Sequence, residues 1–208
     1  MKRFRITILA ICLILAWLGY SDLRVLLRNS EPLTITLADL ERSGAPREWL
    51  TVTDGTQDLM QAINMSGSVT IDSFLVPLKS NLTSNKMMVW FETRDPEIID
   101  ALKTYYFLLD SDQAREEYLA KNRDLFYAKR VITGMTADNL VASANRDKLA
   151  KLLMEMEIPV TDETIFISEG KEPIRWRGFF FLGIAVIGMI KVFMSFAGSS
   201  KKETTEQP

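Results

Sequence analysis

The chain has 208 residues, 47% of them hydrophobic, with 25 basic and 27 acidic side chains, no histidine and one cysteine. Without histidine, neither a Ser-His-Asp nor a Cys-His nucleophile can form. Because Cys12 lies in an apolar segment, the rest of the chain has no thiol or imidazole for a disulfide or a zinc site, and these absences exclude more than any motif identifies.

The first segment of the chain is apolar. Residues 6–20 (ITILAICLILAWLGY) carry no charge and follow three basic residues within the first five. A retained signal anchor and a cleaved signal peptide share this pattern, but cleavage needs small residues before the cut. Gly19 and Ser21 supply these only poorly. We therefore expect residues 1–27 to be a retained transmembrane helix with a short extension.

Residues 28–174 are expected to form an extracytoplasmic domain. About 150 residues suit one domain with its own core, and no repeat or long Gly/Ser linker divides them. Strand composition occurs in four places in the first half. These are residues 31–46, extended at first and ending in a turn at Gly44 and Pro46; residues 47–55, ending in an Asp-Gly turn; residues 68–78, in which Pro77 marks a sheet edge or a bulge; and residues 86–94, reached through a hairpin loop at 79–85.

The second half of this segment changes to helical periodicity. Asp95 can cap a helix whose first turn holds Pro96, where a missing N–H costs nothing, and apolar spacing continues to Leu109. The later elements are a helix over 111–124 with Glu117 and Lys121 spaced for pairing; a strand over 125–134 that stops at Gly134; a helix over 145–156 with Leu149, Leu152, Leu153 and Met156 on its apolar face, Asp147, Lys151 and Glu155 outside, and Pro159 beyond its end; and a strand over 163–170.

This order of elements predicts an α+β domain with a mainly antiparallel sheet. Five or six short strands with helical insertions would also suit a small, partly open barrel of the OB type. Such barrels bind nucleic acid, sugars or other proteins, so the fold would carry no function with it. Flanked by two transmembrane helices, this domain is the fold class that the sequence favours.

A second apolar segment lies near the end of the chain. Residues 175–198 are expected to form a transmembrane helix, followed by a disordered cytoplasmic tail at 199–208. A span needs about 20 apolar residues, yet Lys191 follows Gly178 after thirteen positions. Its side chain could snorkel to the headgroups, or it could face an acidic or polar group on a partner helix. The first span is also short, so the two are matched in length and could pack side by side.

The flanking charges predict the orientation. Outside residues 22–177 there are six basic and two acidic side chains, whereas between these limits 19 basic face 25 acidic ones. By the positive-inside rule, both termini lie in the cytoplasm and the central domain lies across an inner or plasma membrane.

The sequence shows no site with a recognisable chemistry. We assign no catalytic, cofactor-binding or metal-binding residue, and we expect no cofactor. The acids near residues 110–117 lack the calcium-loop pattern, and no glycine-rich phosphate loop occurs. Nucleic acid is not an expected partner, because the domain is acidic; the interleaved basic and aromatic residues of 118–130 are better explained as an amphipathic junction.

The leading hypothesis is a two-span membrane protein without catalysis, whose outer domain binds or helps to assemble another integral membrane protein. Lys191 is the candidate contact inside the bilayer. In layout alone the chain is similar to assembly factors of respiratory complexes, which have two spans and a central outer domain. One alternative is a membrane-anchored ligand-binding module or enzyme that uses carboxylate and tyrosine groups. Another is a homo-oligomer, although Gly178, Gly183 and Gly188 recur every five residues and so spread around the helix.

Overall fold

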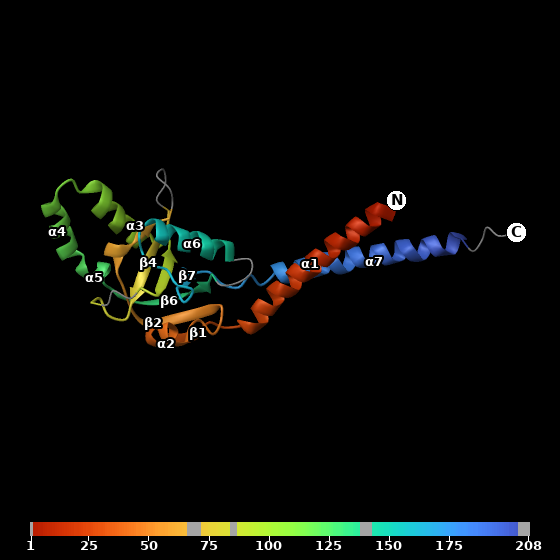
Figure 1. The fold of residues 1–208 in the computed structure, drawn as a ribbon, viewed down its shortest axis with the longest axis horizontal. Helices are drawn as coiled ribbons and strands as arrows, with labels where there is room; N and C mark the ends of the chain where they lie inside the picture. The colour runs from red at the N-terminus through yellow and green to blue at the C-terminus, as the bar shows by residue number, and fades with distance from the viewer. Residues whose placement is uncertain (1, 66–71, 84–86, 138–142, 204–208) are drawn as a thin grey trace. The chain divides into compact units, whose positions relative to one another are not determined.

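The computed structural model describes residues 2–65, 72–83, 87–137 and 143–203 (Figure 1). The chain divides into two compact units. One consists of residues 1–30 and 173–208, and the other of residues 31–172.

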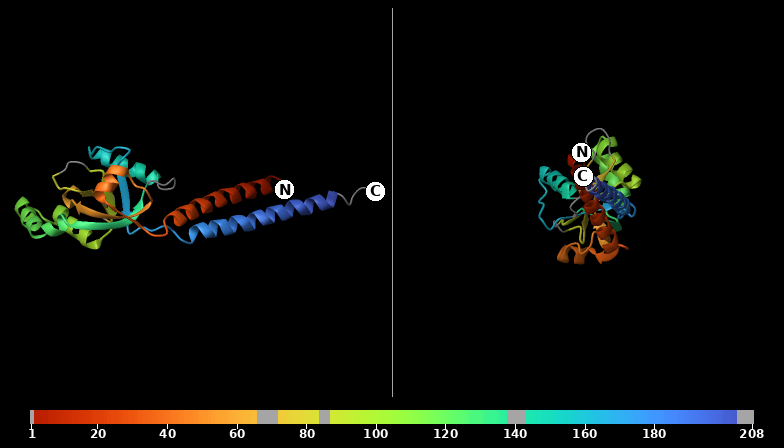
Figure 2. Two further views of the ribbon diagram at one scale, coloured as in Figure 1. Left: turned by 90° about the horizontal axis from the view of Figure 1, so that it is seen from below. Right: turned by 90° about the vertical axis from the view of Figure 1, so that its right-hand side faces the viewer.

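The first unit is an antiparallel pair of long helices. α1 (Lys2–Arg28) and α7 (Arg177–Glu203) run side by side in every view, with the start of α1 and the end of α7 at the same end of the pair (Figures 1 and 2). By length and composition both could cross a membrane, with mean hydropathy 2.0 in the most apolar 18-residue stretch of Ile6–Arg28 and 1.8 over Arg177–Met194. The expected side-by-side packing of the two apolar helices is confirmed.

Glycines allow α1 and α7 to approach closely. A Cβ atom built on Gly19 would lie 2.8 Å from the carbonyl oxygen of Gly178, and one built on Gly188 would collide with Sγ of Cys12. Gly183 has no such neighbour within 4 Å. Gly178 and Gly188 therefore both face α1, which the spacing of five residues did not suggest.

The second unit is built on a seven-stranded sheet in the order β1-β2-β6-β7-β5-β4-β3, and an additional pairing of β2 with β4 closes five of the strands into a barrel. The strands are β1 (Leu33–Thr36), β2 (Trp49–Gln57), β3 (Ile63–Asn64), β4 (Phe74–Lys79), β5 (Val89–Thr93), β6 (Lys129–Thr136) and β7 (Ile165–Glu169). Only β1–β2 and β5–β7 pair in parallel among the described strands. The α+β class and the mainly antiparallel sheet are confirmed.

The strand β2 is longer than predicted. Asp54 and Gly55 do not close it in a turn; they form a bulge, where the register with β6 shifts between Val52 and Gly55 and Asp54 adopts a φ of 61°. A bulge bends a strand and increases its twist. The bend allows the first half of β2 to pair with β1 and its end to pair with β4, which closes the barrel.

Pro77 lies in β4, where its missing N–H is tolerated. On one side β4 pairs with β5 from Phe74 to Leu78, and on the other it pairs with β3 at Phe74 and Leu75 and with β2 at Leu78 and Lys79. The carbonyl of Pro77 accepts a hydrogen bond from Asp58 on this second side. Because the N–H and C=O of a strand residue point the same way, the proline nitrogen faces the gap between the β3 and β2 ladders.

Alternate residues of three strands fill two separate cores. Val89 and Phe91 belong to the barrel interior, while Trp90 between them belongs to an outer cluster, as expected from the two-residue period of a strand. The same alternation occurs along β4 and β7. Both faces are therefore buried, which explains why these strands have little polar character.

Helices cover the two cores. Buried leucines of α2 (Leu37–Ser43) and buried side chains of α3 (Pro96–Lys103) and α5 (Arg123–Phe126) pack into the barrel interior. On the outer cluster lies α6 (Ser143–Glu155), through Leu149 and Leu153. The remaining helical segments are the 3₁₀ turn η1 (Leu59–Gln61), the π turn η2 (Thr104–Leu108) and α4 (Asp112–Lys121).

The helix ends confirm some predictions and correct others. Asp95 caps α3 by accepting from the backbone N–H of Glu97, and Pro96 lies in its first turn, as expected. The predicted continuation to Leu109 is confirmed in part, because α3 ends at Lys103 but the π turn η2 continues the helical segment to Leu108. Met156 is 57% exposed, since α6 ends one residue before it.

Two further details differ from the sequence prediction. β6 does not stop at Gly134 but continues to Thr136. The strand needs a glycine at this position, because a Cβ there would collide with the backbone of Ser168 in β7. On α4, Glu117 accepts a hydrogen bond from Gln113, and within the described residues no ion pair joins it to Lys121 as predicted.

Candidate functional site

Lys191 lies on a face of α7 that is turned away from α1. Gly178, Ala185 and Val192, spaced seven residues apart, are buried in the helix pair, whereas Lys191 is exposed. Within the described residues its ammonium group makes no ion pair. Asp22 of α1 already forms an ion pair with Arg177 of α7. Its two carboxylate oxygens accept hydrogen bonds from the Arg177 guanidinium at 2.7 and 2.8 Å.

The pairing of the two helices gives the level of Lys191 along the pair. Asp22 lies beside Arg177 and Cys12 beside Gly188, so Lys191 is near the level of Leu9. At a rise of about 1.5 Å per residue, that is roughly 6 Å from the level of Arg5. A lysine side chain can span this distance, so its position is compatible with both hypotheses for Lys191, snorkelling and a contact with a partner helix.

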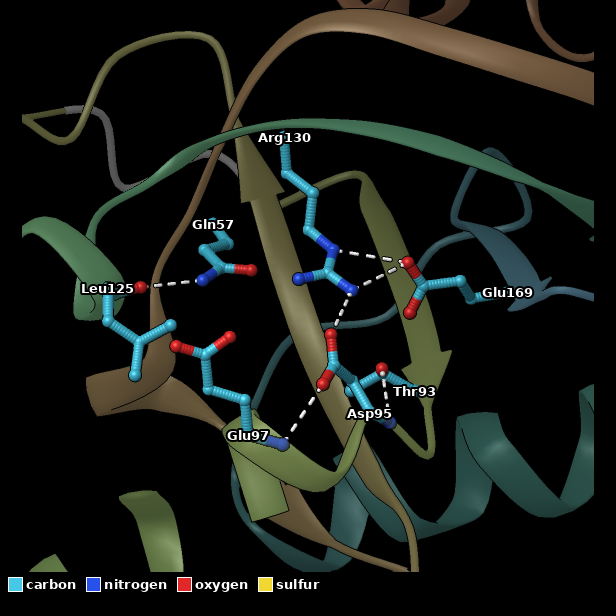
Figure 3. A network of polar contacts seen from close by, with 7 residues as sticks. All are labelled: Gln57, Thr93, Asp95, Glu97, Leu125, Arg130 and Glu169. Carbon is cyan, nitrogen blue, oxygen red and sulfur yellow. Dashed lines mark hydrogen bonds and ion pairs between the residues drawn. The ribbon is translucent and has the colours of Figure 1, made fainter. Parts of the chain in front are cut away.

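In the barrel, a cluster of polar side chains surrounds Arg130 (Figure 3). Nη2 of Arg130 donates to Glu169 and to Asp95, each at 2.8 Å, and Nε donates to the same oxygen of Glu169 at 3.1 Å. The guanidinium lies 5.9 Å from the centre of the Phe91 ring. Arg130 thus joins β6 to the ends of β5 and β7 and to the cap of α3.

These contacts perturb the acidities of the cluster. The hydrogen bond from Arg130 holds the pKa of Asp95 below its usual value, against the opposing effect of burial. Burial alone would lower the pKa of Arg130, but its hydrogen bonds with Asp95 and Glu169 raise it instead. Because both charged forms are stabilised, the cluster fits a permanent structural clamp better than an acid or base that exchanges protons near neutral pH.

A buried ion pair joins the ends of β2 and β4. Nζ of Lys79 donates to Oδ2 of Asp58 at 2.8 Å, and the side chains are only 3% and 7% exposed. Nearby, the hydroxyl of Tyr106 donates to the carbonyl of Met60. Burial and then the neighbouring charges, that of Asp58 among them, raise the pKa of Tyr106 and of Tyr127.

A hollow of about 420 Å³ lies elsewhere on the domain. Its lining comes from the end of α2, the start of α6 and the segment before β7, and Arg146 donates to the carbonyl of Asp162 there. The lining residues are Gly44, Ala45, Arg146, Asp147, Asp162, Glu163, Thr164 and Ile165. The hollow has polar walls but no paired nucleophile and base.

The sequence alone predicts none of the three polar sites in the domain, which are the Arg130 cluster, the Lys79–Asp58 pair and the hollow. It groups Arg130 with the aromatic and basic residues of 118–130, but the structure separates them: Phe126 is fully buried beside Tyr118, while Arg130 turns to Asp95 and Glu169. The one usable signal is Lys79, a lysine at the end of an otherwise apolar strand. In the described ranges no three Asp, Glu or Cys side chains come close enough to hold a metal ion.

Comparisons of the chain with protein-family models, with curated proteins and with solved structures give no match, so only the geometry of the chain itself can support a function.

Proposed function

We propose that the chain is an integral membrane protein with two spans, both ends in the cytoplasm and the barrel domain on the outer side. The proposal is supported by the two apolar helices and by their antiparallel pairing. Three basic residues begin α1 and two end α7, whereas three (Arg24, Arg28 and Arg177) lie at the other end of the pair, so the excess of basic residues is at the end with both termini. By the positive-inside rule that end is cytoplasmic.

The order of the barrel strands supports the OB type. Taken along the chain, the five barrel strands are β2, β4, β5, β6 and β7; the first pairs with the second and fourth, and the third pairs in parallel with the fifth. A helical segment between the third and fourth strands covers the interior. These are features of a five-stranded Greek-key barrel. OB barrels commonly bind their ligands through the loops after the first and fourth strands.

The function that we propose is non-catalytic binding or assembly of another membrane protein. Lys191 carries this proposal, because it is exposed on a face of α7 outside the contact with α1 and has no ion-pair partner in the described part of the chain. Charged residues inside spans usually face a bundle interior and pair there. A carboxylate in a partner's span would complete the pair.

The decisive experiment compares partners recovered in mild detergent from the native membrane. Lys191→Leu is expected to reduce recovery of a specific membrane partner severalfold, whereas Lys191→Arg, which retains the charge, keeps it. If both variants recover as much partner as the original protein does, Lys191 does not contact the partner. Topology is tested separately in a Cys12→Ser background by labelling Ser80→Cys and Ser200→Cys with an impermeant maleimide: we expect only position 80 to react from the outer side.

One observation favours a second candidate, a ligand-binding module or carboxylate- and tyrosine-based enzyme. Asp58, Tyr106 and Tyr127 lie close enough for their charges to interact, and the pKa of both tyrosines is raised. Perturbed acidities gather at functional sites more often than elsewhere. A small-molecule screen would favour this candidate if a bound ligand is lost in Tyr127→Phe but retained in Lys191→Leu.

A further inference from the structure

The end of β2 carries two buried acceptor atoms that receive no hydrogen bond from the described residues. Nε2 of Gln57 donates to the carbonyl of Leu125 at 2.6 Å, but its Oε1 has no partner. Oδ2 of Asp58 accepts from Lys79, but its Oδ1 has none. Gln57 is fully buried and Asp58 is 5% exposed. Buried polar atoms in folded proteins are nearly always hydrogen-bonded, so both of these require a donor.

A cation with unused donors accompanies each acceptor. An ammonium group has three N–H donors, and the ion pair with Asp58 uses one of those on Lys79. Arg130 bonds through Nε and Nη2, and its Nη1 makes no hydrogen bond within the described segments. Nη1 points toward Oε1 of Gln57 in Figure 3.

The strand register supports this view of Gln57 and Arg130. Arg130 pairs with Gly55, two residues before Gln57 on β2. Residues two apart on a strand project from the same face, and diagonal neighbours across a pair are about 7–8 Å apart at the backbone. The two side chains therefore share a face but make no direct hydrogen bond, so one small group would have to bridge them.

The charges decide what can bridge. An unpaired buried acceptor destabilises the fold, and more strongly where the group is charged. The bridging group must donate to the acceptor and accept from the cation. A metal ion has no acceptor for Lys79 or Arg130, and an anion has no donor for Asp58. A neutral group with both properties, such as a hydroxyl or water, satisfies each pair.

We propose that the end of β2 holds two bound water molecules, one between Oδ1 of Asp58 and Nζ of Lys79, and one between Oε1 of Gln57 and Nη1 of Arg130. The site thus takes neutral groups that donate and accept at once. Any ligand that displaces either water must bring a hydroxyl or an equivalent group, because otherwise the buried acceptor loses its donor again.

The test is a crystal structure of the full-length protein in detergent, at a resolution that shows ordered water. We expect one water at each position in the original protein. Gln57→Leu should lose the water beside Arg130 and keep the other, and Asp58→Leu combined with Lys79→Met should do the reverse. Thr51→Val combined with Thr133→Val is the control that keeps both, because these two hydroxyls already bond each other at 2.9 Å.

Direct contacts would overturn the proposal. If another protein group donates straight to Oδ1 of Asp58 or Oε1 of Gln57, no water is needed there. Should a variant fail to fold, oxygen-17 relaxation dispersion on the unaltered full-length protein still counts long-lived internal waters; a count below two would also overturn it.

Discussion

The helix pair and the barrel differ in whether their positively charged side chains have ion-pair partners. In the barrel, Lys79 is paired with Asp58, and Arg130 is paired with two carboxylates. In the helix pair, Arg177 is paired at one end, but Lys191 is exposed and has no ion-pair partner among the described residues. Where charges are matched within the chain, the fold depends on both partners being present, because removing either leaves the other uncompensated. Under the proposed function, the unmatched charge of Lys191 is where an external partner would bind.

The largest effect is expected when the buried barrel pair is broken. Lys79→Met leaves the Asp58 carboxylate buried without its counter-charge, and such losses typically cost about 3–5 kcal/mol. Urea unfolding of the full-length protein in detergent, followed by the fluorescence of the buried Trp90, would measure the change.

The matched control removes both charges. Asp58→Leu combined with Lys79→Met is expected to recover most of the lost stability, since apolar replacements of a buried pair are often neutral or better. If the single and double variants were equally unstable, packing around Lys79 and not its charge would be responsible.

The helix pair should respond to the size of the side chain at the glycines where the two helices touch. In Gly178→Leu the new side chain meets the backbone of α1, where a Cβ would already lie 3.1 Å from the carbonyl oxygen of Gly19. Overpacking of this kind costs about 1–3 kcal/mol. Gly183→Leu is the matched control, because a Cβ there meets nothing within 4 Å. Thermal unfolding of the helices by circular dichroism should show a lower midpoint for Gly178→Leu alone; equal midpoints would contradict the close approach.

Asp95 should give a smaller and pH-dependent effect. Asp95→Ala removes the cap of α3 and one partner of Arg130, and loss of a cap costs about 1 kcal/mol. Asp95→Asn keeps a good capping side chain and removes only the charge, so it should cost less.

The pH dependence of Asp95 follows from its lowered pKa. A carboxylate with a pKa below its unfolded value, here 3.8, stabilises the fold fully above that value, and the contribution is lost as the pH falls through the folded pKa. Urea unfolding repeated from neutral pH to below 3.8 should show a shallower acid loss in Asp95→Asn than in the original protein. Identical slopes would mean that Arg130 does not hold this carboxylate.

Local features of the fold could be predicted, whereas the barrel closure could not. Asp95 and Pro96 marked the start of α3 because capping depends on neighbouring residues alone. Asp54 and Gly55 gave a false turn, since the same dipeptide suits a hairpin or a bulge and only the pairing of β2 with β4 decides between them. Similarly, Leu37 starts a short helix that was not predicted, because seven residues are too few to show a helical period.

The site residues show the same limit. Lys191 could be singled out because a charge stands out within an apolar segment. The partners of Arg130 could not, because Asp95 and Glu169 are 35 and 39 residues away in the chain and meet it only after the sheet forms. Lys79 and Asp58 are likewise brought together by the β2–β4 closure.

The smallest effect is expected for an exposed lysine. It tests whether burial decides how strongly the stability of the fold depends on a lysine–carboxylate ion pair. Lys151 and Glu155 also form a lysine–carboxylate pair, at 3.8 Å, but both side chains are largely exposed. Exposed pairs on a helix contribute about 0.3–0.5 kcal/mol and are screened by salt. Lys151→Met should therefore change urea stability about tenfold less than Lys79→Met, although the same chemical group is removed. A comparable loss for both would show that α6 depends on this ion pair as the barrel depends on Lys79, and the contrast between matched buried charges and solvated ones would fail.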